Sequence, residues 1–247
     1  MELIAKREGV IMKKSSKPVI GIIGVPEHNE ESDVVIGVYN GYKNTVIKYG
    51  CIPFMLCPLQ EFDYYAIRLR EIPDITEEEK QLYREMVDMC DGIIMQGGYR
   101  MYNYCEYILS YAIEKDIPVL GICMGMQLLA KIDNNDYCLE ENTTAIDHKQ
   151  PGEKYVHKVN ILDNTLLKDI VKKEEIKVNS KHRFHVAKVN NFKISAYSED
   201  GLIEAIERTD KRFVLGVQWH PERMIDYDES AANIFKKFIE ECKKEVK

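Results

Sequence analysis

The amino-acid sequence predicts an α/β fold, with helices on both faces of a central, mostly parallel sheet and a small antiparallel extension. Two observations lead to this prediction. Up to Ala130, short apolar runs alternate with segments that carry apolar residues at helical spacing, as in parallel sheets with crossover helices. Beyond Ala130, short strand-like runs follow one another directly.

Four apolar runs predict the parallel strands. The first, KPVIGIIGV, is a β-branched run that Pro26 closes, as expected of a buried parallel strand. In order, the runs occupy residues 17–25, 51–58, 91–98 and 117–123.

Helices are predicted between these strands, the first of them after a polar loop at residues 28–34. Their signals are helical spacing, caps and capping boxes. They comprise residues 35–50, with Gly50 as C-cap, residues 76–90, opened by the pair Thr76 and Glu79, and residues 104–116.

The second half of the chain predicts the extension. Its strand-like runs lie at residues 154–162, 175–180, 185–189, 193–198, 201–207 and 213–220, and a terminal amphipathic helix follows at 229–244. No repeat, low-complexity segment or Pro/Gly/Ser-rich linker divides residues 17–247, which are predicted to form one domain. Residues 1–16 are expected to be a disordered tail, or an extended start upstream of Met12.

Composition excludes several function classes. The 247 residues carry a formal net charge of −7 and no Lys/Arg block with interleaved aromatics, which argues against nucleic-acid binding. No apolar run approaches the roughly 20 residues of a membrane span, and residues 1–17 lack the apolar core of a signal peptide. The seven cysteines are odd in number and show no C-x-x-C spacing, so reduced thiols in a cytoplasm are expected.

The stretch IPVLGICMGMQLLA holds a candidate nucleophile. Gly121 and Gly125 flank Cys123 in a G-x-C-x-G pattern, the cysteine counterpart of the strand–turn–helix elbow of hydrolases. A helix beginning at about Met124 would stabilise a thiolate, and the Met124 N–H could donate to an oxyanion. The pattern alone is equally compatible with a buried free cysteine between a strand and a core helix.

A candidate base follows the last predicted strand. Among six histidines, His220 stands at the end of FVLGVQWH, and Glu222 lies two residues on, beyond Pro221. Ligand sites form at this edge of α/β sheets, and Pro221 restricts the backbone between the two side chains. By itself HPE fits a histidine that ends a strand, but combined with the cysteine elbow it predicts a base and its orienting carboxylate.

Paired glycines supply the third candidate element. Gly97 and Gly98 follow a predicted buried strand, where the Gly98 N–H, with or without that of Gly97, could approach a substrate oxygen. The pair alone would also fit an ordinary turn. His148 and His157 show no ligand spacing, so they are interpreted as loop or pocket residues and no metal site is predicted.

Three segments in this order, QGG, GICMGMQ and QWHPE, resemble class-I glutamine amidotransferase-like hydrolases. VNSKHRFHV and SEDGLIEAIE resemble segments of the γ-glutamyl-γ-aminobutyrate hydrolase branch, and the first strand–helix–strand unit is also similar. The resemblance covers roughly residues 17–242. It implies a flavodoxin-like three-layer sandwich and a family compatible with a homodimer.

The resemblance also implies site roles. Cys123, His220 and Glu222 would form the triad, and Gln127 would help to hold the α-amino-acid end of a glutamyl group. The stretch from Asn179 through Ser180 and Lys181 to His182 would line the pocket. One departure concerns the leaving group: the branch has a longer loop after its paired glycines, whereas here GGYRMYNYCEYIL passes almost directly into a helix. Tyr99, Tyr102 and Tyr104 would wall the pocket or, preferably, pack the helix start.

The hypothesis is therefore a cysteine hydrolase that cleaves a γ-glutamyl amide of a small molecule through a γ-glutamyl thioester, with no metal or organic cofactor. A glutaminase that passes ammonia to a synthetase partner is the alternative within the same chemistry. A non-catalytic binding protein on the same scaffold is disfavoured by the intact Cys, His and Glu positions, and an amidase without glutamyl specificity is disfavoured by Gln127.

Overall fold

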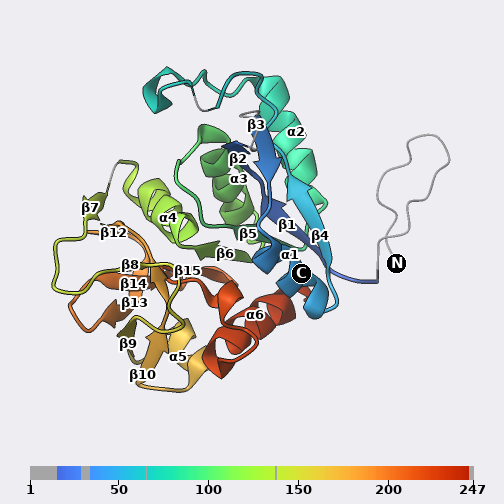
Figure 1. Ribbon diagram of the computed structural model, residues 1–247. Coiled ribbons are helices and arrows are strands. Elements are labelled where there is room, and N and C mark those ends of the chain that lie inside the picture. Colours follow the sequence, from blue (N-terminus) through green and yellow to red (C-terminus); the bar gives the residue numbers. More distant parts are fainter. Residues whose placement is uncertain (1–15, 29–33, 65, 137, 245–247) are drawn as a thin grey trace.

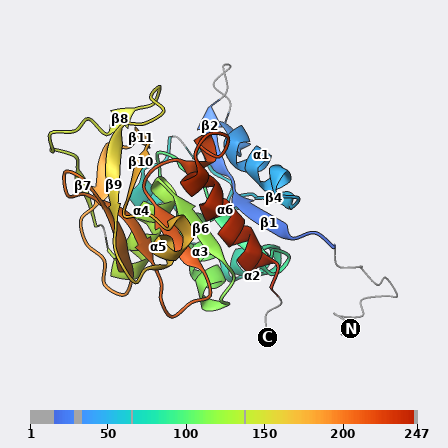
Figure 2. The same ribbon diagram turned by 90° about the horizontal axis from the view of Figure 1, so that it is seen from below.

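The computed structural model describes residues 16–28, 34–64, 66–136 and 138–244, so that nearly all of the expected tail at 1–16 lies outside the described residues. Its main sheet has 11 strands, and the path through it runs β10-β9-β13-β14-β15-β6-β5-β1-β4. Figures 1 and 2 show this twisted sheet between two layers of helices.

One half of the sheet is parallel. It consists of β4 (Ile52–Leu56), β1 (Val19–Ile23), β5 (Gly92–Met95), β6 (Val119–Ile122) and β15 (Val214–Val217). These strands are apolar throughout because helices cover both of their faces, and β5, β6 and β15 are buried at every position.

The other half is antiparallel. It consists of β14 (Ile203–Glu207), β13 (Lys193–Ser198), β9 (His157–Ile161) and β10 (Glu175–Val178), with β12 (Phe184–Val186) and β7 (Leu139–Glu141) paired beside β14. Two small separate sheets pair β2 (Val25–His28) with β3 (Val34–Gly37), and β8 (Lys149–Gln150) with β11 (Ser180–Lys181). The predicted α/β class with an antiparallel extension is confirmed.

Two hydrophobic cores separate the sheet from its helices. One core contains buried side chains of α1 (Asn40–Lys48), α5 (Leu166–Val171) and α6 (Glu229–Cys242). The other contains side chains of α2 (Glu77–Asp88), α3 (Asn103–Glu114) and α4 (Met124–Asn134). Short 3₁₀ turns lie at η1 (Leu69–Glu71) and η2 (Pro221–Arg223). The predicted capping box forms, with the Thr76 hydroxyl accepting from the Glu79 N–H and the Glu79 carboxylate accepting from the Thr76 N–H.

Three local predictions are wrong. Pro26 does not end the first strand segment but lies inside β2, and the expected start of the helix at 35–50 is replaced by β3, which pairs with β2. Of the expected loop at 28–34, residues 28 and 34 lie in these strands and residues 29–33 lie outside the described residues. Proline is tolerated there because β2 pairs on one side only, with β3. The helix begins at Asn40, and Gly50 follows it with φ of +76°. The prediction of a loop or pocket position for His157 also fails, because His157 lies in β9.

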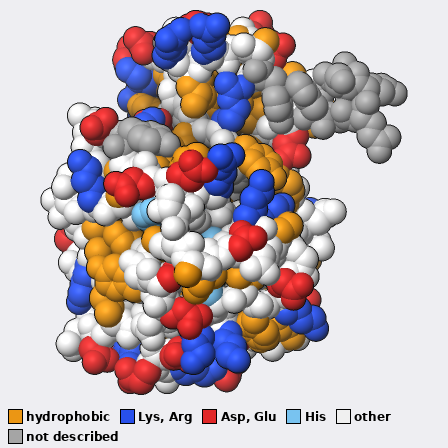
Figure 3. Space-filling model, turned by 60° about the vertical axis from the view of Figure 1, so that its left-hand side comes forward, with side chains coloured by type: hydrophobic (Ala, Val, Ile, Leu, Met, Phe, Trp, Pro, Cys, Tyr) orange, Lys and Arg blue, Asp and Glu red, His pale blue; other side chains and the backbone are white. Residues whose placement is uncertain are grey.

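Within the described residues, no helix combines the length and apolar character that crossing a bilayer requires. On the face shown in Figure 3, basic side chains lie in several small groups separated by acidic and apolar ones.

Candidate active site

Cys123 stands on a sharp turn between β6 and α4. Its backbone has φ of 54° and ψ of −107°, a region that L-residues other than glycine rarely occupy and that is strained. The turn places the buried thiol at the start of α4, at the carboxyl edge of the parallel strands. The cysteine thus has the backbone geometry of a nucleophile elbow.

Two glycines make this turn sterically feasible. A Cβ on Gly121 would lie 2.8 Å from the carbonyl carbon and oxygen of Gly125, and a Cβ on Gly125 would lie 2.3 Å from the carbonyl oxygen of Met95. Real Cβ atoms do not approach other atoms so closely. The G-x-C-x-G pattern is therefore a packing requirement of the crossing between β5, β6 and α4.

His220 is brought to Cys123 by strand pairing. β15 lies parallel to β6, with Gly216 opposite Gly121, so the residues that follow the two strands emerge side by side. The ring Nδ1 of His220 is 2.8 Å from Oε1 of Glu222, and both side chains are buried. Asn179 fixes the His220 backbone, because its side-chain Nδ2 donates to the His220 carbonyl (2.9 Å) and its Oδ1 accepts from the His220 N–H (2.8 Å).

The charges of this group favour an ion pair. Burial alone would raise the pKa of the Cys123 thiol, but the adjacent His220, assisted by His182, lowers that pKa below its usual value. Burial acts to lower the pKa of His220, but the Glu222 carboxylate and the Cys123 thiol raise it to about 10. The Nε2 atom of His220 has no partner of hydrogen-bond geometry among the described residues. The pair is thus poised as a thiolate and an imidazolium.

The paired glycines lie directly against these side chains. A Cβ on Gly97 would be 3.0 Å from Cε1 of His220 and 3.5 Å from Cβ of Cys123, and a Cβ on Gly98 would be 2.9 Å from Cε of Met124. The Gly97 N–H donates to the Tyr42 hydroxyl at 3.0 Å. A side chain at position 97 would crowd His220, so Gly97 lets the loop after β5 approach the catalytic side chains closely.

Two hollows meet at the thiol. One, of about 340 Å³, is lined on its far side by Tyr39, Asn40 and Arg223. The other, of about 690 Å³, is lined by Met124, Gln127 and Phe184. Both are bounded by Gly98, Tyr99, Cys123 and Lys181. A substrate can therefore extend to both sides of Cys123.

The remaining predicted site residues lie around this junction. Gln127 lines the larger hollow, but its amide Nε2 donates to the Phe184 carbonyl at 2.8 Å. Ser180 and His182 are buried, and their side chains are directed to other groups rather than to the thiol: the Ser180 hydroxyl donates to the His148 carbonyl, and Nε2 of His182 faces Glu204.

Of the tyrosines after the paired glycines, Tyr102 and Tyr104 are buried and pack the start of α3, as preferred from the sequence. Tyr99 is 84% exposed and walls both hollows.

Two residues of the site were not predicted. The Tyr42 hydroxyl is buried between the Gly97 N–H and Glu222. Gln96 ties the β2–β3 hairpin to the site, since its Nε2 donates to the carbonyls of Ile23 and Gly37 and its Oε1 accepts from the Tyr39 N–H. The polar Gln96 directly after a fully apolar strand was the available signal; Tyr42 resembled any other core aromatic.

An elbow cysteine, a histidine–carboxylate pair and close glycines on a three-layer α/β sandwich define a class of cysteine-dependent amide hydrolases. Comparison with known proteins agrees with this class. The Peptidase C26 family model matches residues 103–222. The chain is 31% identical over 240 residues to a putative glutamine amidotransferase-like protein of Rickettsia prowazekii, covering 67% of this chain and 85% of that one. The chain therefore belongs to the class-I glutamine amidotransferase-like superfamily.

Further relatives carry synthetase names. A glutamine-hydrolyzing GMP synthase subunit of Haloquadratum walsbyi is 35% identical over 178 residues, covering 70% of this chain and 84% of that one. Among solved structures, a GMP synthase subunit of Thermoplasma acidophilum, described as putative, has a TM-score of 0.60 at 14% identity, covering 92% of this chain and 96% of that one. The structural likeness confirms the fold.

Proposed function

We propose that the protein hydrolyses a γ-glutamyl amide through a covalent thioester on Cys123. The observation that carries this proposal is the placement of a buried, low-pKa thiol at the junction of two hollows, beside a histidine that a carboxylate orients. Family membership supplies the glutamyl substrate class.

In the first half of the reaction, the Cys123 thiolate attacks the δ-carbonyl carbon of the glutamyl side chain. The Met124 N–H, at the start of α4, and the Gly98 N–H stabilise the oxyanion of the tetrahedral intermediate. Gly97 cannot serve equally, because its N–H is engaged by Tyr42. The His220 imidazolium donates its Nε2 proton to the leaving amine as the C–N bond breaks, which leaves the thioester.

In the second half, neutral His220 accepts a proton from a water molecule that attacks the thioester carbonyl. The C–S bond then breaks, the thiolate is restored and glutamate leaves. Glu222 stabilises the imidazolium and holds Nδ1 as a donor throughout, and Asn179 fixes the backbone on which the ring stands.

The two hollows divide the substrate between them. We place the glutamyl group in the larger hollow, where Gln127 and Lys181 can meet its α-amino and α-carboxylate groups. We place the amine in the smaller hollow beside Tyr39 and Arg223. The exposed Tyr99 borders both hollows and would contact the substrate near the scissile bond.

A free-standing γ-glutamyl-amine hydrolase, with γ-glutamyl-γ-aminobutyrate as the suggested substrate, is preferred because a hollow is present on the leaving-group side. The alternative is a glutaminase that serves a synthetase, which the names of the GMP synthase relatives favour. In that case the smaller hollow would be a route for ammonia.

Glutamate release from a substrate panel tests the proposal. The panel comprises glutamine, γ-glutamyl-γ-aminobutyrate, γ-glutamyl-putrescine and γ-glutamyl dipeptides, with Cys123→Ala as the inactive control. We expect turnover of a γ-glutamyl amine by wild type and a loss of at least about a thousandfold in the control, because the nucleophile is absent. Turnover of glutamine alone would favour the synthetase alternative. No release from any amide would contradict the proposal.

A further inference from the structure

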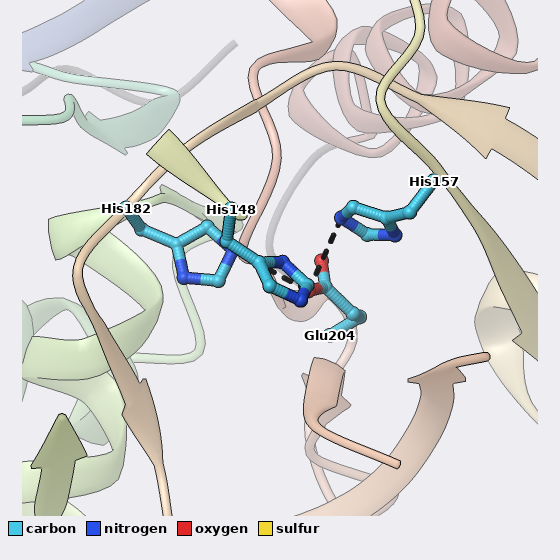
Figure 4. A group of neighbouring side chains, drawn as sticks. All are labelled: His148, His157, His182 and Glu204. Atoms are coloured by element: carbon cyan, nitrogen blue, oxygen red, sulfur yellow. Dashed lines mark ion pairs between the residues drawn. The ribbon is translucent and has the colours of Figure 1, made fainter. Parts of the chain in front are cut away.

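We propose that the antiparallel half of the molecule contains a buried site for one divalent transition-metal ion, best matched by Zn²⁺, formed by His148, His157, His182 and Glu204. This histidine–glutamate cluster shares no residue with the catalytic triad. Figure 4 shows the four side chains converging from different segments of the chain.

The cluster is buried. One ligand-type atom from each of the four residues can be chosen so that all lie within 4.8 Å of one another, and all four side chains are 99–100% buried. His157 comes from β9, Glu204 from β14, His182 from the segment after β11, and His148 from the residue before β8. Burying the inward-facing atoms of His157, His182 and Glu204 without hydrogen-bond partners is costly.

The inward-facing atoms are unpartnered. Nε2 of His157, Nε2 of His182 and both carboxylate oxygens of Glu204 have no hydrogen-bond partner among the described residues. Nε2 of His182, Nε2 of His157 and Nδ1 of His148 lie 3.4, 3.6 and 3.7 Å from Oε1 of Glu204. Each contact is too long for a strong hydrogen bond.

These separations match a coordination shell. Tetrahedral Zn²⁺ with N and O ligands at about 2.1 Å places each pair of ligand atoms about 3.4 Å apart. The three contacts to Glu204 already have this spacing to within a few tenths of an ångström. The ligand atoms lie at most 4.8 Å apart, so the most distant pair would need to approach by about 1.4 Å to reach this spacing.

The outer nitrogens have the partners that metal-bound histidines require. Nδ1 of His157 lies 3.2 Å from the Lys158 carbonyl, Nδ1 of His182 lies 3.1 Å from the Phe184 carbonyl, and Nε2 of His148 lies 3.0 Å from the Asp200 carboxylate. Each of these three partners is an acceptor to which the outer nitrogen can donate a proton. In that tautomer the inner nitrogens carry lone pairs directed at the cluster, which is the arrangement that orients a metal ligand. Nδ1 of His148 also lies 3.4 Å from the Ser180 hydroxyl. Nδ2 of Asn142, which donates to the His182 carbonyl, also lies 3.2 Å from Nδ1 of His182.

A proton is the competing occupant. Although burial opposes it, the Glu204 carboxylate raises the pKa of His182, so a metal-free protein could hold an imidazolium against Glu204. A proton satisfies one nitrogen only and leaves the lone pairs of the other two imidazoles unused, whereas a divalent ion engages all four groups.

The ion would hold the segment that positions the catalytic base. His182 lies three residues after Asn179, whose side chain fixes the His220 backbone, and the intervening Ser180 hydroxyl donates to the carbonyl of His148. Four protein ligands leave no position for a substrate, so the site is structural. A hollow of about 410 Å³, lined in part by His148 and His182, lies beside the cluster.

Metal analysis of the full-length protein tests the site without relying on activity. Every measurement is made in a Cys123→Ser background, because the active-site thiol could itself bind zinc. The protein is stripped with a chelator, reconstituted with Zn²⁺ and desalted, and its zinc content and thermal midpoint are measured. We expect one zinc per chain and a midpoint that rises on reconstitution, because the ion binds only the folded state.

His157→Gln is the test variant and His185→Gln the matched control, since His185 lies in the same antiparallel half but bonds to Asn142 instead of facing the cluster. We expect the test variant to lose the zinc and the control to keep it. If His157→Gln does not fold, Asp200→Asn keeps all four ligands and should weaken zinc affinity by about 10–100-fold. Less than about a tenth of a zinc per chain after reconstitution, with an unchanged midpoint, would overturn the site. Equal zinc retention in His157→Gln and in the His185→Gln control would also overturn the site. Where Asp200→Asn replaces His157→Gln, an unchanged zinc affinity of Asp200→Asn would overturn it.

Discussion

At the scale of single residues, the chemistry depends on how neighbours set the charge of Cys123. The charge of the thiol is influenced by His220, which follows β15, by His182, which follows β11, and by Glu222, and the thiol in turn acts on Tyr42 of α1. Burial and Glu222 raise its pKa, whereas the two histidines lower it. The net direction is downward, so the attractive charges outweigh burial.

This balance predicts the pH dependence of the thiolate. As pH falls, the thiolate persists below the usual cysteine pKa near 9, and as pH rises, the imidazolium is lost near its pKa of about 10. The ion pair is therefore present from the lowered pKa of Cys123 up to the His220 pKa of about 10. Its contribution to stability is lost below the first of these pKa values and above the second. Ultraviolet absorbance of the thiolate, followed against pH, should show Cys123 titrating below the usual value of 9.

The control for this titration is His220→Ala. Burial remains in this variant while the main favourable charge is gone, so the Cys123 pKa should rise above its usual value. Cys123→Ser supplies the background absorbance. A Cys123 titration that is unchanged in His220→Ala would contradict the ion pair.

At the scale of secondary-structure elements, the site depends on the close crossing of α4 and β5. Gly125→Ala would place a Cβ 2.3 Å from the Met95 carbonyl oxygen. The backbone cannot relieve this contact without shifting α4, so we expect a loss of about 2–4 kcal/mol in the free energy of unfolding, measured by urea denaturation. Gly152→Ala is the control, because a Cβ there meets nothing within 4 Å, and it should change stability by less than about 0.5 kcal/mol. Equal effects of the two substitutions would show that the crossing is not tight.

The elements also show what sequence patterns could and could not predict. The parallel strands and their helices were predictable because long apolar runs and a capping box have local signals. The β2–β3 hairpin was missed because Pro26 suggested a strand end, and aliphatic residues 34–37 fitted the helical pattern. The strands β7, β8 and β11 and the helix α5 are two to six residues long, too short to show periodicity.

The residues of the candidate sites also differ in how well the sequence could predict them. Cys123, the paired glycines and the HPE stretch each lie at the end of an apolar run, so the sequence could indicate them. The histidine–glutamate cluster could not be found by spacing, because only the tertiary fold brings together residues as distant as His148 and Glu204. The one local indication of the cluster in the sequence was a charged residue, Glu204, within the apolar run that forms the wholly buried strand β14.

At the scale of the whole molecule, cysteine reactivity should be confined to one position. All seven cysteines are free. Burial is the main cause that raises the pKa of Cys51, Cys57, Cys90, Cys105, Cys138 and Cys242, whereas the pKa of Cys123 is lowered. Reaction requires the thiolate, so the native fold selects a single thiol.

Brief treatment of the folded protein with iodoacetamide near neutral pH should therefore modify Cys123 alone, as read by peptide mass spectrometry. Cys123→Ser should remain unmodified under the same conditions, and the urea-unfolded protein should be labelled at all seven cysteines. Labelling of Cys57 as fast as Cys123 in the folded protein would argue against a specially activated thiol.

The pairing of β15 beside β6 also has a consequence for biosynthesis. Cys123 leaves the ribosome well before His220, and until then it lacks the largest of the charges that favour its ionisation. The growing chain therefore carries a less reactive thiol until His220 has followed it out of the ribosome. The nucleophile is switched on when the last strand of the sheet docks, so a prematurely truncated product would be chemically quiet.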